Sequence, residues 1–412
     1  MIQKIKGTMD ILPDKTPLFR YIEGIMREEA EKYGFGEIRV PTFELTELFV
    51  RGVGDTTDVV QKEMYTFLDG EDSITLRPEG TAGVARALIE NGKYGDTMPQ
   101  KYYYIMSCFR HEKPQAGRTR EFFQFGTEMF GADTPAADAT VIALAYSVLT
   151  RLGLSGIRLH LNSIGCKACR PAFREALTEH FSGHVGEICD TCRERLGKNP
   201  LRLLDCKSPI CSAIAKKAPR TVDHLCPDCA AHFEQLCKIL DAMEIPYVVD
   251  PAIVRGLDYY TRTVFEFVAE GIAAQSTVCG GGRYDGLVES LGGPALSGIG
   301  FGMGITRVIM AMEKEGLANI EAPAPRLYIA TLGDKAVPTA VAIAERLRRD
   351  GLYVECDLVG RSLKAQMKYA NKLGADYTLI LGDSEIESGK AFLRDMKNSE
   401  QTEIELATFT LK

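Results

Sequence analysis

Residues 99–131 have the sequence PQKYYYIMSCFRHEKPQAGRTREFFQFGTEMFG, which contains the clearest strand pattern of the chain together with charged residues. Its first half contains a continuous apolar and aromatic run, residues 102–106, which predicts a buried strand. A polar segment that contains Gly117 breaks the run, and a second strand is predicted over residues 122–129. The stretch therefore predicts a long β-hairpin with a charged loop.

Charged and polar residues stand on this hairpin where a core strand normally has none: Arg110, Glu112, Gln124 and Glu128. An unpaired charge out of water is costly, so a guanidinium at the end of a buried strand needs an anionic partner. One interpretation pairs Arg110 with Glu128 inside the core. The other uses Arg110 and the loop residue Arg118 to bind phosphate, which suits the guanidinium fork.

The composition limits the class of protein. The chain has 412 residues, which predicts about two to three domains. Its net charge of -7 argues against a protein that coats nucleic acid without specificity. The N-terminus has no apolar signal region, and no run of about 18 apolar residues occurs. We therefore expect a cytoplasmic protein without a membrane segment, whose cysteines are thiols or metal ligands.

A second polar motif follows a hairpin predicted over residues 64–76. The sequence RPEGT occupies residues 77–81, and a helix is predicted over residues 82–91. In one interpretation Thr81 is the N-cap of this helix and Glu79 is solvated beside it. In the other, the carboxylate and the hydroxyl at the end of a core strand hold an ammonium group.

Eight of the cysteines form three C-x-x-C pairs and one C-x4-C pair within residues 166–240. They are Cys166, Cys169, Cys189, Cys192, Cys206, Cys211, Cys226 and Cys229. This spacing is typical of zinc ligands, and eight thiolates suffice for two tetrahedral sites. Free thiols or a redox pair are the alternatives. The spacing does not decide which pairs would share a site.

Glycine alternates with apolar residues over residues 298–304, before a helix predicted over residues 305–314. Glycine at alternate strand positions removes the side chains from one face, so a flat ligand can lie against the backbone. The spacing differs from the G-x-G-x-x-G phosphate loop. After a proline-rich linker at residues 322–325, strands and helices alternate, which predicts a small α/β domain with a mainly parallel sheet.

These segments together resemble the histidine–tRNA ligase family of class II aminoacyl-tRNA synthetases along essentially the whole chain. The matching segments, in order, are KGTMDILP at residues 6–13, the class II motif 1 region around Pro41, RPEGT at 77–81, the motif 2 sequence FRHE at 109–112, LDYY at 257–260 after Arg255, GGRYD at 281–285, and motif 3 ending at Arg307.

The resemblance implies an α+β fold in which helices flank an antiparallel sheet and motif 1 forms a homodimer. It divides the chain into a catalytic domain in two parts, residues 1–165 and 241–321, and an α/β anticodon-binding domain, residues 326–412. The cysteine-rich and mainly helical residues 166–240 are then an insertion.

The implied reaction joins L-histidine to ATP, with Mg2+, and transfers the histidyl group to the 3' end of its tRNA. The alternative within the same fold is a non-catalytic regulatory subunit of ATP phosphoribosyltransferase. That paralogue generally lacks the anticodon domain and the complete RPEGT and LDYY signatures. A zinc-stabilised RNA-binding module without catalysis is a further alternative.

The resemblance also implies roles for individual residues. The catalytic residues are Arg110 and Arg255. ATP is bound by Arg110, Glu112, Arg118 and Arg307. The amino end of histidine is held by Glu79, Thr81 and Gln124, and its ring by Glu128 with Tyr259 or Tyr260.

Motif 3 and a helix of the last domain carry two further features. Thr306 stands where the family normally has an acidic residue, which weakens the ATP assignment around it. Lys364, Lys368 and Lys372 fall on one face of a predicted helix. They are either a solvated surface or contacts to tRNA phosphates.

Overall fold

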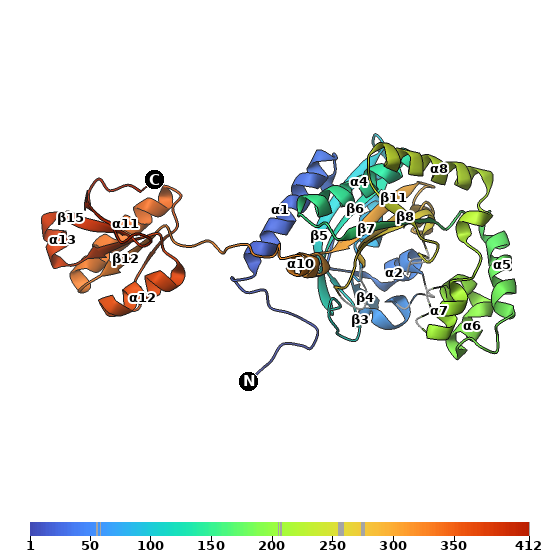
Figure 1. Ribbon diagram of the computed structural model, residues 1–412, viewed down its shortest axis with the longest axis horizontal. Coiled ribbons are helices and arrows are strands. Elements are labelled where there is room, and N and C mark those ends of the chain that lie inside the picture. Colours follow the sequence, from blue (N-terminus) through green and yellow to red (C-terminus); the bar gives the residue numbers. More distant parts are fainter. Residues whose placement is uncertain are drawn as a thin grey trace. The chain divides into compact units, whose positions relative to one another are not determined.

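The computed structural model describes residues 1–411 except 55, 56, 58, 205, 207, 254–258 and 273–276 (Figure 1). The chain forms two compact units, Met1–Ile320 and Glu321–Lys412. Within the described residues, no helix is long and apolar enough to cross a membrane.

The first unit is built on an eight-stranded sheet with the order β1-β5-β6-β11-β10-β9-β7-β8. The strands are β1 (Gly36–Glu37), β5 (Gln100–Phe109), β6 (Glu121–Phe130), β7 (Ile157–Ser163), β8 (Tyr247–Val249), β9 (Thr261–Ala269), β10 (Thr277–Arg283) and β11 (Gly298–Gly304). The interior pairs are antiparallel, and only the outer pairs β1–β5 and β7–β8 are parallel. The predicted hairpin is β5 and β6, and the antiparallel α+β fold is confirmed.

One face of this sheet is covered by helices that pack on its apolar side chains. The helices are α1 (Thr16–Lys32), α4 (Pro135–Arg151) and α10 (Ile305–Lys314). Phe125 of β6 lies fully buried in this core with Ile22 of α1 and Ile142 of α4. Because successive strand residues point to opposite faces, Gln124 and Glu128 project from the other face of β6.

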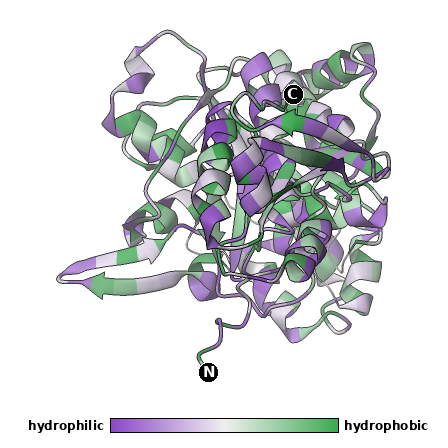
Figure 2. Cartoon of the chain, turned by 90° about the vertical axis from the view of Figure 1, so that its left-hand side faces the viewer, coloured by the Kyte–Doolittle hydropathy of each residue, from purple (hydrophilic) through white to green (hydrophobic). Residues whose placement is uncertain are grey.

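The second face is covered by α3 (Thr81–Glu90) and the short helix α9 (Leu287–Ser290), whose apolar residues pack against Tyr104 and Tyr284. A separate three-stranded antiparallel sheet follows the order β2-β4-β3. It is formed by β2 (Phe43–Leu45), β3 (Tyr65–Asp69) and β4 (Asp72–Leu76), with α2 (Thr46–Val53) after β2. Figure 2 shows hydrophobic and hydrophilic residues side by side along most helices, as expected for helices that pack on one face.

The cysteine-rich segment is mainly helical, as predicted. It contains α5 (Arg170–Ser182), α6 (Asp190–Lys198), α7 (Pro209–Ala215) and α8 (Pro227–Ala242). The first three lie together, apart from the labelled strands of the large sheet (Figure 1). They share a small core of their own, whereas Leu236 and Leu240 of α8 are buried in the main core. The predicted insertion boundary at residue 240 stays a prediction.

The second unit is a small α/β domain with a five-stranded sheet of order β13-β12-β14-β15-β16. Its elements are β12 (Leu327–Thr331), α11 (Val337–Arg349), β13 (Val354–Cys356), α12 (Leu363–Leu373), β14 (Tyr377–Leu381), α13 (Asp383–Ser388), β15 (Lys390–Asp395) and β16 (Gln401–Glu405). β12 pairs in parallel with β13 and β14, whereas β15 and β16 are antiparallel. The predicted parallel arrangement therefore holds for the first three strands.

Candidate active site

Two buried carboxylates, Glu79 and Glu128, lie between α3 and the glycine-containing part of the large sheet. Glu79 is 4% exposed and Glu128 is fully buried. Their hydrogen-bond donors are backbone amides and hydroxyl groups, and within the described part of the chain neither carboxylate forms an ion pair. Buried carboxylates without a cation are costly, so these two side chains are suited to bind a positively charged ligand. We refer to them and the hydroxyl groups that contact them as the pocket.

Glu79 lies at the N-terminus of α3. Its carboxylate accepts hydrogen bonds from the backbone amides of Thr81 (2.7 Å) and Ala82 (2.9 Å), which have no partner within the first turn of the helix. Burial raises the pKa of Glu79, although these amides and Arg110 oppose the rise. The interpretation of Thr81 as the N-cap beside a solvated Glu79 is wrong, because the N-cap residue is Gly80 and the buried Glu79 carboxylate accepts from the first amides of the helix.

Glu128 is held from three sides by hydroxyl groups. Its Oε1 accepts from Thr81 Oγ1 at 2.7 Å and from the Tyr104 hydroxyl at 3.1 Å, and its Oε2 accepts from the Tyr284 hydroxyl. Burial, together with the neighbouring Glu79 charge, raises the pKa of Glu128 to about 8 against the opposing effect of these hydrogen bonds. The predicted internal pair with Arg110 is not formed between these two described residues.

Tyr104 and Tyr284 were not among the predicted site residues. Tyr104 stands opposite Gly126 in the β5–β6 register, and the absence of a side chain there makes room for its ring, since a Cβ on Gly126 would lie 2.2 Å from Tyr104 Cζ. Tyr284 belongs to the GGRYD motif, to which no role was assigned. Tyr102 and Tyr104 alternate along the first predicted strand and so share one face of it, which was the only sequence signal for a role of Tyr104.

Tyr259 also lies at this pocket. Its ring centroid is 4.7 Å from that of Tyr260 and 5.7 Å from that of Tyr284. Burial raises the pKa of the Tyr259 phenol, and the neighbouring Tyr260, Glu79 and Glu128 add to the rise. Tyr259 therefore lies beside both carboxylates, and Tyr260 is buried in the core next to it.

The glycines of β11 leave space that side chains of β6 partly occupy. Gly300 is paired with Glu128, and a Cβ there would lie 2.1 Å from Glu128 Oε2. A Cβ on Gly302 would lie 2.4 Å from Gln124 Nε2. The glycines therefore leave room for the side chains of two predicted histidine-binding residues, Glu128 and Gln124, in addition to any flat ligand on the exposed backbone.

Arg110, at the end of β5, lies at the edge of this pocket. Its Nε donates to the carbonyl of Pro78 at 2.9 Å, and its guanidinium carbon is 5.4 Å from the centroid of the Phe122 ring. Its charge also acts on Glu79. In the following loop, Arg118 and Glu112 form an ion pair at 3.1 Å. These contacts orient the hairpin end and its loop toward the same site.

Arg307, in α10, joins the loop to the sheet. Its Nε donates to Gly117 O at 3.0 Å and its Nη1 to Thr277 O at 2.7 Å. Burial lowers the pKa of the Arg307 guanidinium, and the neighbouring cations Arg118 and Arg110 lower it further. Three guanidinium groups near one another repel, so an anion such as phosphate is stabilised among them.

Thr306 and Arg255 are the last two positions that the sequence singled out for this site. The hydroxyl of Thr306 is buried and has no hydrogen-bond partner among the described residues. Arg307 is nevertheless fixed by its two carbonyl partners, so its position does not depend on an acid at residue 306. Arg255 lies outside the described residues, and so do Leu257 and Asp258 of the LDYY signature.

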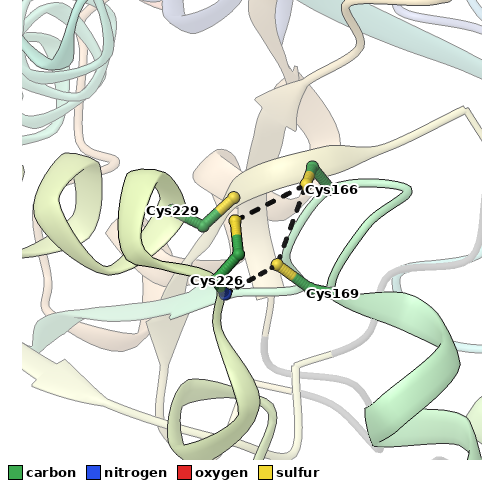
Figure 3. Close-up of side chains that lie close together, drawn as sticks. All are labelled: Cys166, Cys169, Cys226 and Cys229. Carbon is green, nitrogen blue, oxygen red and sulfur yellow. Dashed lines mark hydrogen bonds between the residues drawn. The ribbon is translucent and has the colours of Figure 1, made fainter.

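The eight paired cysteines form two separate clusters. Cluster 1 consists of Cys166, Cys169, Cys226 and Cys229, and cluster 2 of Cys189, Cys192, Cys206 and Cys211. In each cluster the four sulfur atoms lie within 4.8 Å of one another and could hold a metal ion. Figure 3 shows the side chains of cluster 1 pointing toward one another from the loop before α5 and from the start of α8.

Two buried carboxylates near a group of three arginines are an arrangement that suits a small cationic substrate next to a polyphosphate. They lie on an antiparallel sheet flanked by helices, which is the arrangement expected of a class II aminoacyl-tRNA synthetase. An α/β domain follows in the chain, as expected for anticodon binding.

Comparisons with known proteins agree with this class. The family model described as histidyl-tRNA synthetase matches residues 7–308, and an anticodon binding domain matches residues 326–410. Histidine–tRNA ligases of Caldicellulosiruptor bescii and Acetivibrio thermocellus are 51% and 52% identical; the alignments cover 98% and 99% of this chain and 96% and 98% of those proteins. The apo histidyl-tRNA synthetase of S. aureus has a TM-score of 0.82 at 40% identity, covering 99% of this chain and 98% of that chain. The chain belongs to the histidyl-tRNA synthetase family.

These findings also decide between the two interpretations of the fold. The relatives that share about half of their residues with this chain are histidine–tRNA ligases, and both the catalytic and the anticodon models match. The ligase interpretation is therefore confirmed over the regulatory-subunit alternative.

Proposed function

We propose that this chain activates L-histidine with ATP, giving histidyl-adenylate and pyrophosphate, and then transfers the histidyl group to the 3' end of its tRNA. The observation that carries the proposal is the pair of buried carboxylates, Glu79 and Glu128, next to Arg110. A substrate with two cationic or hydrogen-bond-donating groups satisfies both carboxylates, and an arginine beside it can hold the phosphate at which the substrate reacts.

In the activation step, the carboxylate of histidine attacks the α-phosphate of ATP, and the bond from that phosphorus to the pyrophosphate oxygen breaks. No protein nucleophile is required, so catalysis depends on positioning and on stabilisation of negative charge. Arg110 would hold the α-phosphate. Arg118 would contact the terminal phosphates, and Arg307 would stack on adenine while its carbonyl partners keep it in place.

In the transfer step, a hydroxyl of the terminal ribose attacks the carbonyl carbon of the adenylate and AMP leaves. Recognition of histidine rests on its ammonium and its ring. Glu79, Thr81 and Gln124 would hold the ammonium end, and Glu128 with Tyr259 the imidazole. An amino acid without a hydrogen-bonding ring would leave Glu128 buried without its partner, so binding alone discriminates strongly.

Mg2+ belongs to this proposal as the ion that neutralises the pyrophosphate charge when bound. Glu112 and Glu266 would supply the carboxylate oxygens, because Glu112 lies beside Arg118, which would contact the terminal phosphates, and both carboxylates act on Arg307. Zinc in the cysteine clusters would be structural, since neither cluster includes a residue of the pocket.

A homodimer is supported by an exposed apolar face on the β2-β4-β3 sheet. Leu45 and Phe67 both stand opposite Ile74 in the strand register, so they share one face. Phe43, Leu45 and Phe67 are 55%, 54% and 48% exposed. A second copy would bury these side chains. Sedimentation should give a dimer, with Phe43→Glu shifting it toward the monomer.

The second unit would bind tRNA in the cytoplasm, where tRNA is charged. Lys364, Lys368 and Lys372 are exposed on α12, as the predicted helical spacing requires. Phosphate contacts from this row would make tRNA affinity depend on salt concentration.

The decisive experiment is histidine-dependent exchange of labelled pyrophosphate into ATP. We expect exchange with histidine and none with amino acids of similar size that lack the imidazole. Folded protein that supports no exchange would overturn the catalytic proposal.

A further inference from the structure

We propose that each cysteine cluster binds one zinc ion and that the two ions have different roles: the ion in cluster 1 positions the Tyr259–Tyr260 segment of the histidine pocket, and the ion in cluster 2 stabilises the insertion. The positioning role rests on the proposed function, whereas zinc binding does not.

The sulfur positions fit tetrahedral zinc. A Zn–S bond of about 2.3 Å implies sulfur atoms about 3.8 Å apart. Cys166 Sγ lies 3.7 Å from Cys169 Sγ and 3.8 Å from Cys226 Sγ. In cluster 2, Cys189 Sγ lies 3.8 Å from Cys206 Sγ. Disulfides would need about 2.05 Å, and the described cysteines are all free thiols.

Backbone groups around the clusters favour thiolates. The amide of Cys226 donates to Cys169 Sγ at 3.1 Å, and that of Cys189 donates to Cys211 Sγ at 3.2 Å. Such outer hydrogen bonds orient ligands and stabilise their charge. Gly165 is also adapted to cluster 1, because it has a φ of 66° and a Cβ there would lie 2.6 Å from Cys169 Cβ.

Cluster 1 is joined to the pocket through the backbone next to it. Gly165 O accepts from Arg262 N at 2.9 Å, and the Ile164 amide donates to Arg262 O at 2.8 Å. Arg170 Nη2, one residue beyond Cys169, donates to Tyr260 O at 2.5 Å. The loop that carries half of the cluster therefore holds the strand that follows Tyr259.

The start of β9 contains a strained backbone conformation that its surroundings must hold in place. Arg262 has a φ of 51°, in the left-handed region that residues other than glycine seldom adopt. On its other side, Arg262 Nη1 lies 3.5 Å from His232 Nδ1 of α8, and His232 Nε2 is 2.8 Å from Asp138 Oδ2. Both chain segments of cluster 1 thus fix the same part of β9.

Cluster 2 has a different environment. Cys192 and Cys211 are fully buried in the core of the insertion, among Phe173, Leu177 and Phe181. This core is too small to stabilise a folded unit by burial alone, and metals commonly supply the difference in small domains. We found no hydrogen bond in the described residues from cluster 2 to the pocket, so loss of this ion should unfold the insertion locally.

Metal content tests the first half of the proposal. Elemental analysis of protein purified without chelator or metal-affinity resin should give two zinc ions per chain. Cys226→Ser should leave one, Cys211→Ser should leave one, and the control Cys237→Ser, outside both clusters, should leave two. Wild-type protein with about one zinc per chain would overturn zinc binding in one of the clusters, and protein with less, or with all twelve thiols reactive without unfolding, would overturn it in both.

Kinetics test the positioning role without removing a ligand. Arg170→Ala should keep two zinc ions and raise the KM for histidine in pyrophosphate exchange by about tenfold, the effect of one lost charged hydrogen bond. The KM for ATP should stay unchanged, and Arg170→Lys should recover part of the loss. The matched control is Arg174→Ala, one turn further along α5, whose side chain donates to Gly197 O within the insertion.

The outcomes separate the two proposals. Two zinc ions in a protein that supports no exchange would retain zinc binding and remove the catalytic proposal. Normal exchange with an unchanged KM for histidine in both Arg170→Ala and Cys226→Ser would overturn the positioning role. An equal effect of Arg170→Ala and Arg174→Ala would reduce cluster 1 to a structural element of the insertion.

Discussion

Replacement of Glu128 by glutamine should stabilise the free protein while it removes histidine binding. Glu128 is fully buried, and burial with the nearby Glu79 charge raises its pKa from 4.5 to about 8. Between these values the folded protein holds a proton on Glu128 that the unfolded chain has lost. The free energy of unfolding therefore falls as the pH rises through this window, and the contribution is level above about pH 8.

The magnitude follows from the two pKa values. At about 1.4 kcal/mol per pH unit, the whole difference from 4.5 to about 8 amounts to about 5 kcal/mol. Glu128→Gln carries no titrating group, so its stability relative to wild type should increase with pH. Between pH 6 and pH 8 the increase should reach at most about 3 kcal/mol.

Urea denaturation at several pH values, followed by circular dichroism because the chain contains no tryptophan, measures this difference. Glu29→Gln is the matched control. Hydrogen bonds from Lys32, Ser147 and Arg151 outweigh burial and lower the pKa of Glu29. Its contribution is lost only as the pH falls into the acid range, so this variant's difference from wild type should be level between pH 6 and pH 8.

Calorimetry gives an independent measurement. Histidine binding that ionises Glu128 should release a proton near pH 7, seen as a heat that depends on the buffer, and Glu128→Gln should release none. A stability difference that is level between pH 6 and pH 8, or a glutamine variant less stable than wild type at pH 8, would refute the reasoning.

Three further predictions follow from the contacts described above. Arg110→Ala should slow adenylate formation about 100-fold or more while histidine binding by calorimetry changes little; equal losses in both would argue against a phosphate role. Asp138→Ala should lower the free energy of unfolding by about 3 kcal/mol, because it removes one of the two carboxylates that pair with the fully buried Arg283, with Asp285 remaining at 2.9 Å, and also the acceptor of the Thr263 hydroxyl; a urea midpoint like that of wild type would contradict this. Lys368→Ala should reduce the salt dependence of tRNA binding by about one counterion, measured as the slope of log Kd against log salt, whereas an unchanged slope would place this lysine outside the interface.

The sequence predicted the elements that local patterns determine. The hairpin, the helix α10 and the helix α12 occur where the spacing of apolar residues and glycines indicates them. Such patterns depend only on residues that are close to one another in the sequence, so they can be identified without a structure. The large antiparallel sheet followed from the resemblance rather than from periodicity, because strand order depends on contacts between distant segments.

The site was harder to predict for the same reason. Tyr284 donates to Glu128 from 156 residues further along the chain, so no local pattern connects them. Capping preferences favoured Thr81 as the N-cap, but burial of Glu79 under the sheet makes the carboxylate the better partner for the free amides. The division of the eight cysteines into two clusters could not be predicted either, because each C-x-x-C pair indicates two ligands of one site but not which other pair completes it.

The position of cluster 1 also has a consequence for the evolution and engineering of the chain. Its four cysteines bring the segment that enters the insertion next to the segment that leaves it. Residues 171–220, which follow Arg170, therefore form a segment whose two ends are held close together by this cluster. We expect that this segment can be shortened, lengthened or replaced by a reporter domain as long as Arg170 and the four cysteines are kept, because these residues hold the strands that carry the pocket.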